Sequence, residues 1–432
     1  MNRITVIFFN KDIETVRALM QSKSRSVAFW YSPGLLSYEY LSDILEIEEV
    51  LVEASVYEDF KISYPDLIVN VKHSGFGMRN MEHVKRTFKP ILFLSSSDTI
   101  TKSFKPLVDL LGTVPFKMVC KPRENAKHAA DVMGIPAVDI HLSVQHISSY
   151  SALVMGNDWG PTERKLNEEF LLAGINTVCI QESSIDFNSR DNRMRFCSFP
   201  IFQGVATLQN MSVNGLICAV IGNPRFEDLK KSPLPERRRA LVNVNFTYGI
   251  HEEVRQTWVQ DIVSSCAEVE IDYIISQHPR DTGNLSQYNV LQSNSMLVHD
   301  SIRESSVVIS RFSALLTEAI CLGRPCIYYN PHQEEMHYKF EADNKMFFLA
   351  KNKTELAIAL TRINELQSSS VINDMEFIKK HLGVTHSGLA SHYIKMALLD
   401  ISAMPAFKKG RIINLLKICL IIIKRIVRRQ RY

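Results

Sequence analysis

The stretch that decides the fold is VVISRFSALLTEAICLGRPCIYYNP, which runs from Val307 to Pro331. Its first residues, VVIS, form a short β-branched apolar run that is typical of a buried strand. The polar turn Ser310-Arg311-Phe312-Ser313 then leads into a helix-like segment, and Gly-Arg-Pro ends that segment before a second strand-like run, CIYY. The pattern predicts one β-α-β step, the unit from which parallel sheets are built.

The same alternation of strand-like and helix-like segments extends in both directions along the chain. It predicts an α/β protein with two Rossmann-like domains, each built on a doubly wound, mostly parallel sheet. We expect an N-terminal domain over residues 1–228, a linker over 229–239 (LKKSPLPERRR), a C-terminal domain over 240–403 and a basic tail over 404–432. In the C-terminal domain we expect SMLVH to be a strand, and helices at about 251–268, 313–322, 353–366, 370–382 and 387–402. Two such domains leave a cleft at the carboxyl ends of their strands, so polar residues that follow strands are the candidate site residues.

Composition excludes several classes of protein. With 46% hydrophobic and 22% charged residues among 432, the chain has the composition of a folded protein with two domains. The net charge is only +4, and nine Lys and Arg residues lie in Phe407–Tyr432, so the rest of the chain is slightly acidic. This distribution argues against nucleic-acid binding.

The cysteines and the N-terminus indicate a cytoplasmic location. The eight cysteines are scattered through apolar runs and form no C-x-x-C pair, which favours reduced core thiols over disulfides or a zinc site. The first apolar run, ITVIFF, is too short for a signal peptide.

The turn after Ile309 is a candidate phosphate-binding element. Free backbone N–H groups and the helix dipole favour an anion at a helix N-terminus, and Ser310, Arg311 and Ser313 add side-chain donors. Glu318 lies about one and a half helical turns further on, where a carboxylate can reach a ribose or sugar hydroxyl. The alternative is that the two serines only cap the helix.

A second candidate donor-binding group is SQHPRD, which ends the strand-like run DYIISQ. The imidazole of His278 can donate a hydrogen bond to a phosphate oxygen, Pro279 fixes the turn, and Arg280 adds positive charge. A purely structural histidine is the alternative.

Three carboxylates in the first domain are candidates for acid-base or nucleophilic chemistry: Asp158, Glu182 and Glu227. Asp158 and Glu182 follow strand-like runs, although either could instead cap a helix or hold a loop. Glu227 follows a Gly-Asn-Pro turn beside Arg225, which we expect to contact a charged donor. The residues alone do not choose among the three.

The combination GNDWGPTERK, VIGNPRFEDL, SQHPRD and SRFSALLTEAICLGRPCIYYNP resembles GT-B-fold glycosyltransferases of bacterial capsule, lipopolysaccharide and O-antigen assembly. The resemblance covers roughly residues 150–350. It is greatest to families that include the 3-deoxy-manno-octulosonic acid (Kdo) transferases, and looser to sialyl- and polysialyltransferases. It implies that His278, Pro279, Ser310 and Ser313 bind the nucleotide of a CMP-activated donor sugar. Glu227 departs from the aspartate expected in the Gly-Asn-Pro-Arg-Phe motif.

The chain has no Asp-x-Asp triplet, so we expect no metal site, and no cofactor other than a nucleotide-sugar co-substrate. In Ile412–Ile423 the apolar run is broken by Lys417 and flanked by basic residues, which predicts an interfacial helix on an anionic inner membrane surface. The expected partners are therefore a nucleotide-activated donor, a glycan or glycolipid acceptor, and that membrane surface. Rival interpretations are a nucleotide-sugar 2-epimerase, a CDP-polyol phosphotransferase and a non-catalytic scaffold of polysaccharide assembly.

Overall fold

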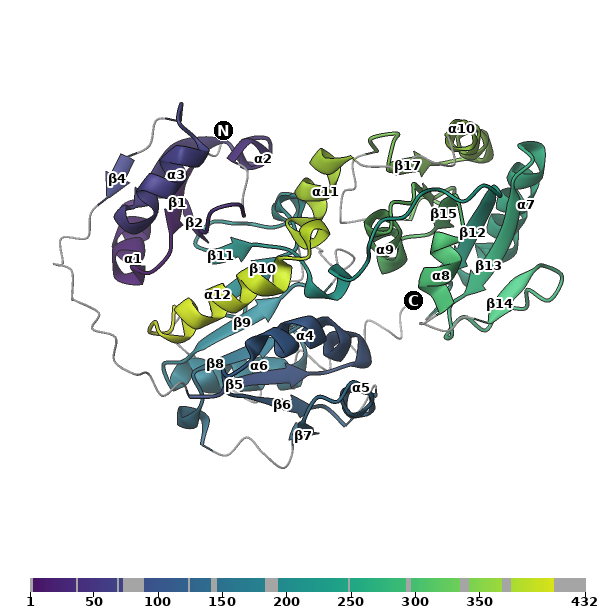
Figure 1. Cartoon of the computed structure of the whole chain (residues 1–432). Coiled ribbons are helices and arrows are strands. Elements are labelled where there is room, and N and C mark those ends of the chain that lie inside the picture. The colour runs from purple at the N-terminus through teal and green to yellow at the C-terminus, as the bar shows by residue number, and fades with distance from the viewer. Residues whose placement is uncertain are drawn as a thin grey trace. The chain divides into compact units, whose positions relative to one another are not determined.

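The computed structural model describes residues 3–35, 38–67, 70–72, 89–122, 125–140, 146–182, 193–247, 249–292, 297–334, 342–366 and 374–407. These residues form two compact units, each with a parallel β-sheet and helices (Figure 1). The first unit contains the described residues up to 182, those of 193–227 and those of 382–407, and the second contains the described residues of 228–381. The α/β class with two parallel-sheet units is therefore confirmed.

The sheet of the first unit has eleven described strands in the order β4-β3-β1-β2-β11-β10-β9-β8-β5-β6-β7. The strands are β1 Ile4–Phe9, β2 Ser26–Trp30, β3 Ile47–Glu53, β4 Asn70–Lys72, β5 Ile91–Ser95, β6 Phe116–Cys120, β7 Ala137–Asp139, β8 Ala152–Met155, β9 Asn176–Ile180, β10 Phe199–Phe202 and β11 Ile217–Val220. Alternate residues of one strand enter different core clusters, as Phe9 and Phe8 do, because successive side chains point to opposite faces. Central strands are thus buried on both faces, which explains their continuous apolar sequences.

The helices of this unit include α1 Ile13–Ser22, α2 Tyr38–Ser42, α3 Tyr57–Ser63, α4 Asp98–Leu111, α5 Ala126–Val132, α6 Pro161–Leu172 and α12 Ala390–Ser402. Short polar caps begin several of them. Asp12 accepts a hydrogen bond from the backbone N–H of Thr15 at the start of α1, and Ser97 accepts one from Ile100 at the start of α4.

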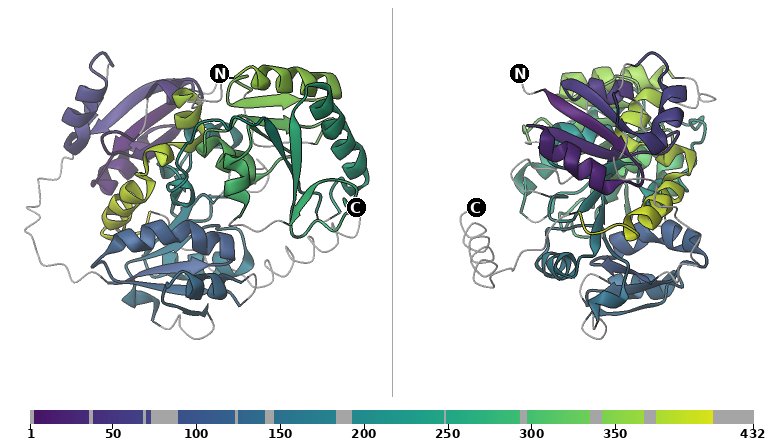
Figure 2. Two further views of the ribbon diagram at one scale, coloured as in Figure 1. Left: turned by 45° about the vertical axis from the view of Figure 1, so that its right-hand side comes forward. Right: turned by 90° about the vertical axis from the view of Figure 1, so that its left-hand side faces the viewer.

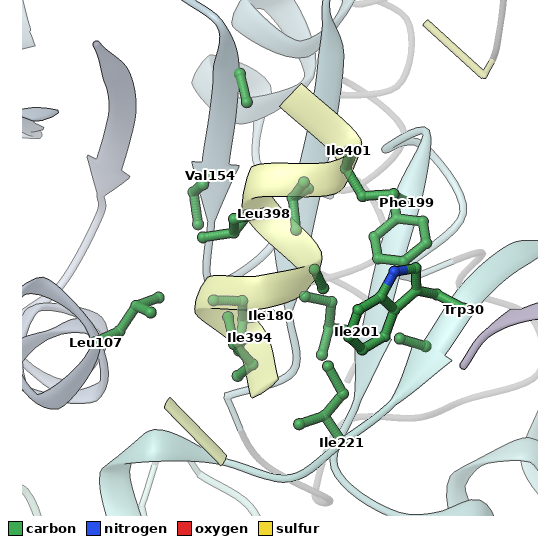
Figure 3. Packing of buried hydrophobic residues seen from close by; sticks show 14 of the residues in the cluster. Trp30, Leu107, Val154, Ile180, Phe199, Ile201, Ile221, Ile394, Leu398 and Ile401 are labelled. Carbon is green, nitrogen blue, oxygen red and sulfur yellow. The ribbon is translucent and has the colours of Figure 1, made fainter. Parts of the chain in front are cut away.

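Helix α12 belongs to the first unit, although the sequence predicted a C-terminal domain that extends to residue 403. Its buried residues Ile394, Leu398 and Ile401 enter the same core cluster as Val154 and Ile180 of the first sheet (Figure 3). Both views of Figure 2 show α12, in yellow, between the purple N-terminal strands and the blue α4. The amphipathic pattern of 387–402 predicted the helix but carried no information on which sheet its apolar face would cover.

Residues 404–407, which the sequence assigned to the basic tail, also pack on the first unit. The buried amide of Asn176 donates hydrogen bonds to the carbonyls of Ile401, Met404 and Pro405, and its oxygen accepts one from the backbone N–H of Phe407. The interfacial helix expected beyond this point lies outside the described residues. No helix in the described part of the chain is long and apolar enough to cross a membrane.

The second unit has a six-stranded parallel sheet in the order β14-β13-β12-β15-β16-β17. Its strands are β12 Arg239–Val244, β13 Asp272–Gln277, β14 Val290–Gln292, β15 Val307–Ser310, β16 Cys326–Tyr329 and β17 Phe347–Ala350. Its helices are α7 Arg255–Glu268, α8 Leu297–Arg303, α9 Ala314–Cys321, α10 Lys353–Asn364 and α11 Met375–Leu382. The β-α-β step predicted at Val307–Pro331 is confirmed as β15, α9 and β16, which pair in parallel.

Two features of this unit differ from the sequence expectation or extend it. Leu297–Arg303 is helix α8, so the strand predicted at SMLVH is wrong where the structure describes it. Arg324, in the Gly-Arg-Pro break, is completely buried and donates hydrogen bonds to the carbonyls of Ser232, Pro233 and Arg303. The hydrogen bonds to Ser232 and Pro233 hold part of the expected linker on the second unit. Burial lowers the pKa of Arg324 to about 10.

The cysteines follow the expected pattern wherever they are described. Cys120, Cys179, Cys197, Cys218, Cys266, Cys321 and Cys326 are free and buried. Burial raises the pKa of Cys266 to about 12, so its thiol stays protonated at neutral pH.

The placement of α12 predicts a localised effect of Ile394→Ala. Removing this completely buried side chain should cost about 2–5 kcal/mol, because it leaves a cavity in the first core. Hydrogen exchange should then speed up in β8 and β9 and stay unchanged in β12 and β15. Met396→Ala, on the same helix and 36% exposed, is the matched control. Faster exchange confined to β12 and β15 would contradict the placement.

Candidate functional site

The carboxyl ends of β12, β13, β15 and β16 lie at one edge of the second sheet, because all four strands run in parallel. The segments that follow them begin at Asn245, His278, Arg311 and Asn330. In open parallel α/β sheets this edge is the usual ligand-binding edge. We therefore describe it as the candidate site and take its residues in turn.

Arg311 holds this edge together from inside. Its side chain is only 5% exposed and donates hydrogen bonds to the carbonyls of Asn245 and Ile250. It also pairs with a carboxylate oxygen of Glu334 at 2.5 Å and lies over the ring of Phe246, 4.4 Å from its centroid. The sequence predicted that Arg311 donates hydrogen bonds to a phosphate. In the structure its guanidinium instead connects the loop after β12 to the loop after β16.

Asp281 makes the corresponding connection between the loops after β12 and β13. Its buried carboxylate accepts hydrogen bonds from the backbone N–H groups of Phe246 and Gly283, and it pairs with Arg255 at 3.0 Å. Sequence reasoning missed both Asp281 and Arg255 as members of this network. Their partners lie in other segments of the chain, so no local pattern marks them.

The two serines of the predicted phosphate turn have different environments. Ser310 is completely buried, and its hydroxyl oxygen accepts a hydrogen bond from the amide of Asn243 at 2.8 Å. Ser313 is partly exposed and is the N-cap of α9, where its hydroxyl oxygen accepts a hydrogen bond from the backbone N–H of Leu315. The cap leaves other N–H groups of the first helical turn without intrahelical partners, as at any helix start.

His278 follows β13 and is half-buried, with Pro279 and Arg280 exposed beside it. Its Nδ1 accepts a hydrogen bond from the backbone N–H of Arg280 at 3.1 Å, so in the neutral ring the proton is on Nε2. Burial, and then the charge of Arg280, lower the pKa of His278 below its usual value of 6.5. At neutral pH the residue therefore presents a neutral N–H donor.

Glu318 forms a pair that the sequence did not predict. Its carboxylate is 7% exposed and lies 2.8 Å from Nε2 of His299, a residue of α8 that is 32% exposed. The sequence missed His299 because SMLVH was interpreted as a strand. The pair fixes the position of a buried carboxylate on α9 beside the N-terminal turn of that helix.

In the first unit, Asp158 has the surroundings of a structural residue. It is completely buried, and its two carboxylate oxygens accept hydrogen bonds from the backbone N–H groups of Met194, Phe196 and Cys197 at 2.7–3.0 Å. These bonds hold the chain that enters β10. The expectation of a general base at Asp158 conflicts with this burial, because a base must reach the proton of a bound hydroxyl.

Glu227 anchors α12. One of its carboxylate oxygens accepts a hydrogen bond from the backbone N–H of Ser391, and the other accepts one from the Ser391 hydroxyl, both at 2.5 Å. Arg225 is partly exposed and lies over the ring of Phe226, 5.4 Å from its centroid. The carboxylate expected to do chemistry is thus tied to the start of a helix that the sequence placed in the other domain.

Glu182, the third candidate carboxylate, is partly exposed and is the second residue after β9. Its backbone carbonyl accepts a hydrogen bond from Asn223 at 2.8 Å, which joins the ends of β9 and β11. Glu182 and Glu227 are both partly exposed, whereas Asp158 is completely buried. Both carboxylate oxygens of Glu227 bind Ser391, so Glu182 stays the candidate for acid-base chemistry.

A polar pair near Asp158 was also missed by sequence reasoning. Glu163, in the first turn of α6, is almost completely buried and lies 3.1 Å from the amine of Lys121, which follows β6. A β-carbon at Gly160 would lie 2.1 Å from the Glu163 carboxylate, so only glycine leaves room for this arrangement. The second glycine of GNDWG is therefore a packing requirement of this pair.

Comparison with known proteins gives a structural likeness only. No protein-family model matches the chain. No curated protein matches it either. A putative UDP-N-acetylglucosamine 2-epimerase from Listeria monocytogenes is 12% identical and has a TM-score of 0.48, over 72% of this chain and 95% of the other. The wall teichoic acid polymerase TagF is 15% identical and has a TM-score of 0.47, over 73% and 89%. At such values neither likeness assigns a substrate or a reaction to this chain.

The surroundings of Asp158 predict the effect of Asp158→Asn. Each carboxylate oxygen of Asp158 accepts at least one backbone N–H, so the NH₂ group of the asparagine amide must face a donor that it cannot accept. The lost hydrogen bond should lower the free energy of unfolding by about 1–3 kcal/mol. Chemical denaturation measures this, with Asp109→Asn, whose side chain is 58% exposed, as the control. A variant as stable as the control that lacks all activity would instead support the catalytic role.

The lowered pKa of His278 predicts a pH dependence of stability. Between the folded pKa and 6.5 the unfolded chain binds more protons than the folded one, so stability is present above pH 6.5 and falls as the pH decreases below it. Between pH 7.5 and pH 5.5 the wild type should lose more stability than His278→Gln, which cannot titrate. Equal losses in urea denaturation would contradict this.

Proposed function

We propose that the chain is a GT-B-type glycosyltransferase whose second unit binds a nucleotide-activated donor sugar at the carboxyl edge of its sheet. The observation that carries the proposal is the set of groups at that edge: the neutral N–H donor of His278, the capped N-terminus of α9 at Ser313, and the buried Glu318. The motifs that resemble surface-polysaccharide glycosyltransferases contain these same residues.

The spacing of these groups fits a nucleoside phosphate. β13 and β15 flank β12, so the segments after them begin about 10 Å apart. A phosphate at the first turn of α9 would meet free backbone N–H groups and the positive end of the helix dipole. His278 would donate to another oxygen of the donor, and Glu318, held by His299, would accept from a ribose or sugar hydroxyl. Ser310 and Arg311 would not contact the donor; they would hold the turn of residues 310–313 in position through their buried contacts.

For the donor we propose a CMP-linked sugar of the Kdo or sialic-acid type, and for the acceptor a bacterial surface glycan or glycolipid. The resemblance of SQHPRD and SRFSALLTEAICLGRPCIYYNP to the corresponding families supports this choice. The acceptor would bind to the first unit, where Glu182 is the proposed acid-base residue. Reaction without a metal ion or a further cofactor remains part of the proposal.

We further propose that the enzyme works at the inner face of the cytoplasmic membrane. Nine Lys and Arg residues and no acidic residue lie in Phe407–Tyr432. Such a segment gains about 1 kcal/mol per basic residue near an anionic surface. Attachment would confine the enzyme to the surface that holds a lipid-linked acceptor.

The hydrogen-bond pattern of His278 predicts a difference between two variants. His278→Ala should weaken CMP binding at least about tenfold, because the donor to a phosphate oxygen is lost. The side-chain amide of His278→Gln can present an N–H near the position of Nε2 and should retain most of the affinity. Calorimetric titration of CMP measures both, with the exposed His392→Ala as the control.

The donor class is tested separately with CMP, CDP, UDP, GDP and ADP. A nucleotide at one hundred times its dissociation constant stabilises the protein by about 2.7 kcal/mol, which raises the melting temperature. A shift with CMP alone supports the proposal. A shift with UDP or GDP alone overturns the donor choice, and no shift with any nucleotide overturns the proposed function.

A further inference from the structure

His251, His332 and Glu334 form a cluster at the same edge of the second sheet that the proposed function does not use. His251 lies in the loop after β12, and the other two lie in the loop after β16. One possible ligand atom from each residue can be chosen so that all three lie within 4.8 Å of one another. The imidazole rings are 4.7 Å apart between centroids, and Nε2 of His332 lies 3.8 Å from a carboxylate oxygen of Glu334.

His332 is the residue in this cluster whose surroundings indicate a ligand. Its side chain is only 8% exposed, and neither ring nitrogen has a hydrogen-bond partner among the residues that the structure describes. A buried polar group without a partner costs about 1–3 kcal/mol. Nε2 faces Glu334 and the ring lies beside His251, so a cation bound between the three residues would give one of the two ring nitrogens a partner.

The structure around the cluster holds the three side chains in place. Arg311 donates a hydrogen bond to the carbonyl of Ile250, the residue before His251, and pairs with one carboxylate oxygen of Glu334. Asn330 binds both the backbone N–H and the carbonyl of Glu334, at 2.6 and 2.9 Å. Supporting contacts of this kind orient metal ligands in known sites.

The geometry points to a binding site for a Zn²⁺-class transition-metal cation formed by His251, His332 and Glu334. Two imidazoles and one carboxylate are a donor set that Zn²⁺ accepts, and imidazole nitrogen disfavours Mg²⁺ and Ca²⁺. One oxygen of Glu334 is paired with Arg311. The other lies 3.8 Å from Nε2 of His332, accepts a long hydrogen bond of 3.4 Å from the Tyr328 hydroxyl, and is the proposed ligand oxygen. Tetrahedral Zn²⁺ places its ligand atoms about 3.4 Å apart, so the side chains, whose ligand atoms lie within 4.8 Å of one another, would have to rotate toward the ion.

This site would link the loop after β12 to the loop after β16, and a water molecule would take the fourth position. It goes beyond the proposed function, which requires no metal. From the absence of an Asp-x-Asp triplet, the sequence predicts no metal site. A cluster built from two loops on either side of β15 leaves no such local motif in the sequence.

The test is a titration of the full-length, chelator-treated protein with Co²⁺, followed through visible d–d absorption, and then displacement by Zn²⁺. The wild type should bind one ion per chain. His251→Ala, His332→Ala and Glu334→Gln should each weaken binding at least about tenfold. His128→Ala, which removes an exposed histidine of the first unit, is the matched control and should bind as the wild type does.

Circular dichroism and melting of the metal-free variants check that they fold. If His332→Ala fails to fold, His251→Ala decides, because that side chain is 34% exposed and its loss leaves no cavity in the core. The proposal is overturned if the wild type binds no stoichiometric ion, or if His251→Ala binds with unchanged affinity. Nucleotide binding by the metal-free protein tests the proposed function independently of this outcome.

Discussion

The candidate site depends on one buried charge, the guanidinium of Arg311. Its hydrogen bonds to the carbonyls of Asn245 and Ile250 and its ion pair with Glu334 join two loops that lie on either side of β15. Burying a guanidinium is costly unless its N–H groups have partners, and the two terminal nitrogens of Arg311 find theirs in these two loops. The ring of the adjoining Phe246 lies under the same guanidinium, and the backbone N–H of Phe246 donates a hydrogen bond to the carboxylate of Asp281. Four strand ends are thus held by a network beneath the surface that a ligand would contact.

This network separates residues that support the site from residues that can meet a ligand. Ser310 and Arg311 are buried beneath the candidate ligand-binding surface, and their polar atoms bind Asn243 and the two loops. Ser313, at the partly exposed start of α9, and His278, with its Nε2–H, lie where a ligand can approach. The same neighbourhood holds His332, whose ring nitrogens lack partners in the described part of the chain. The proposed donor site and the proposed cation site therefore share one set of supporting contacts.

In the first unit, the last described helix has a comparable organising effect. α12 brings residues from near the end of the chain into the core formed by β8, β9 and β10 (Figure 3). Glu227 binds the start of this helix, and Asn176 binds the segment that follows it. The chain therefore leaves the first unit after Glu227 and returns to it at Leu382. Two polar side chains that looked functional in the sequence are engaged within this unit: Glu227 binds the start of α12, and Asp158 binds the backbone that enters β10.

The sequence by itself determined the fold class and much of the secondary structure. Continuous apolar runs such as ITVIFF and VVIS specified buried parallel strands, and the turn at Ser310–Ser313 specified the strand-to-helix step, because these signals are local. It also placed His278 directly after a strand and Ser313 at the start of a helix. The tertiary structure alone decided which polar residues face solvent. Burial of Asp158, the return of α12, the pairing of His299 with Glu318 and the meeting of His251 with His332 all join distant segments, and their energies depend on partners that no local pattern contains.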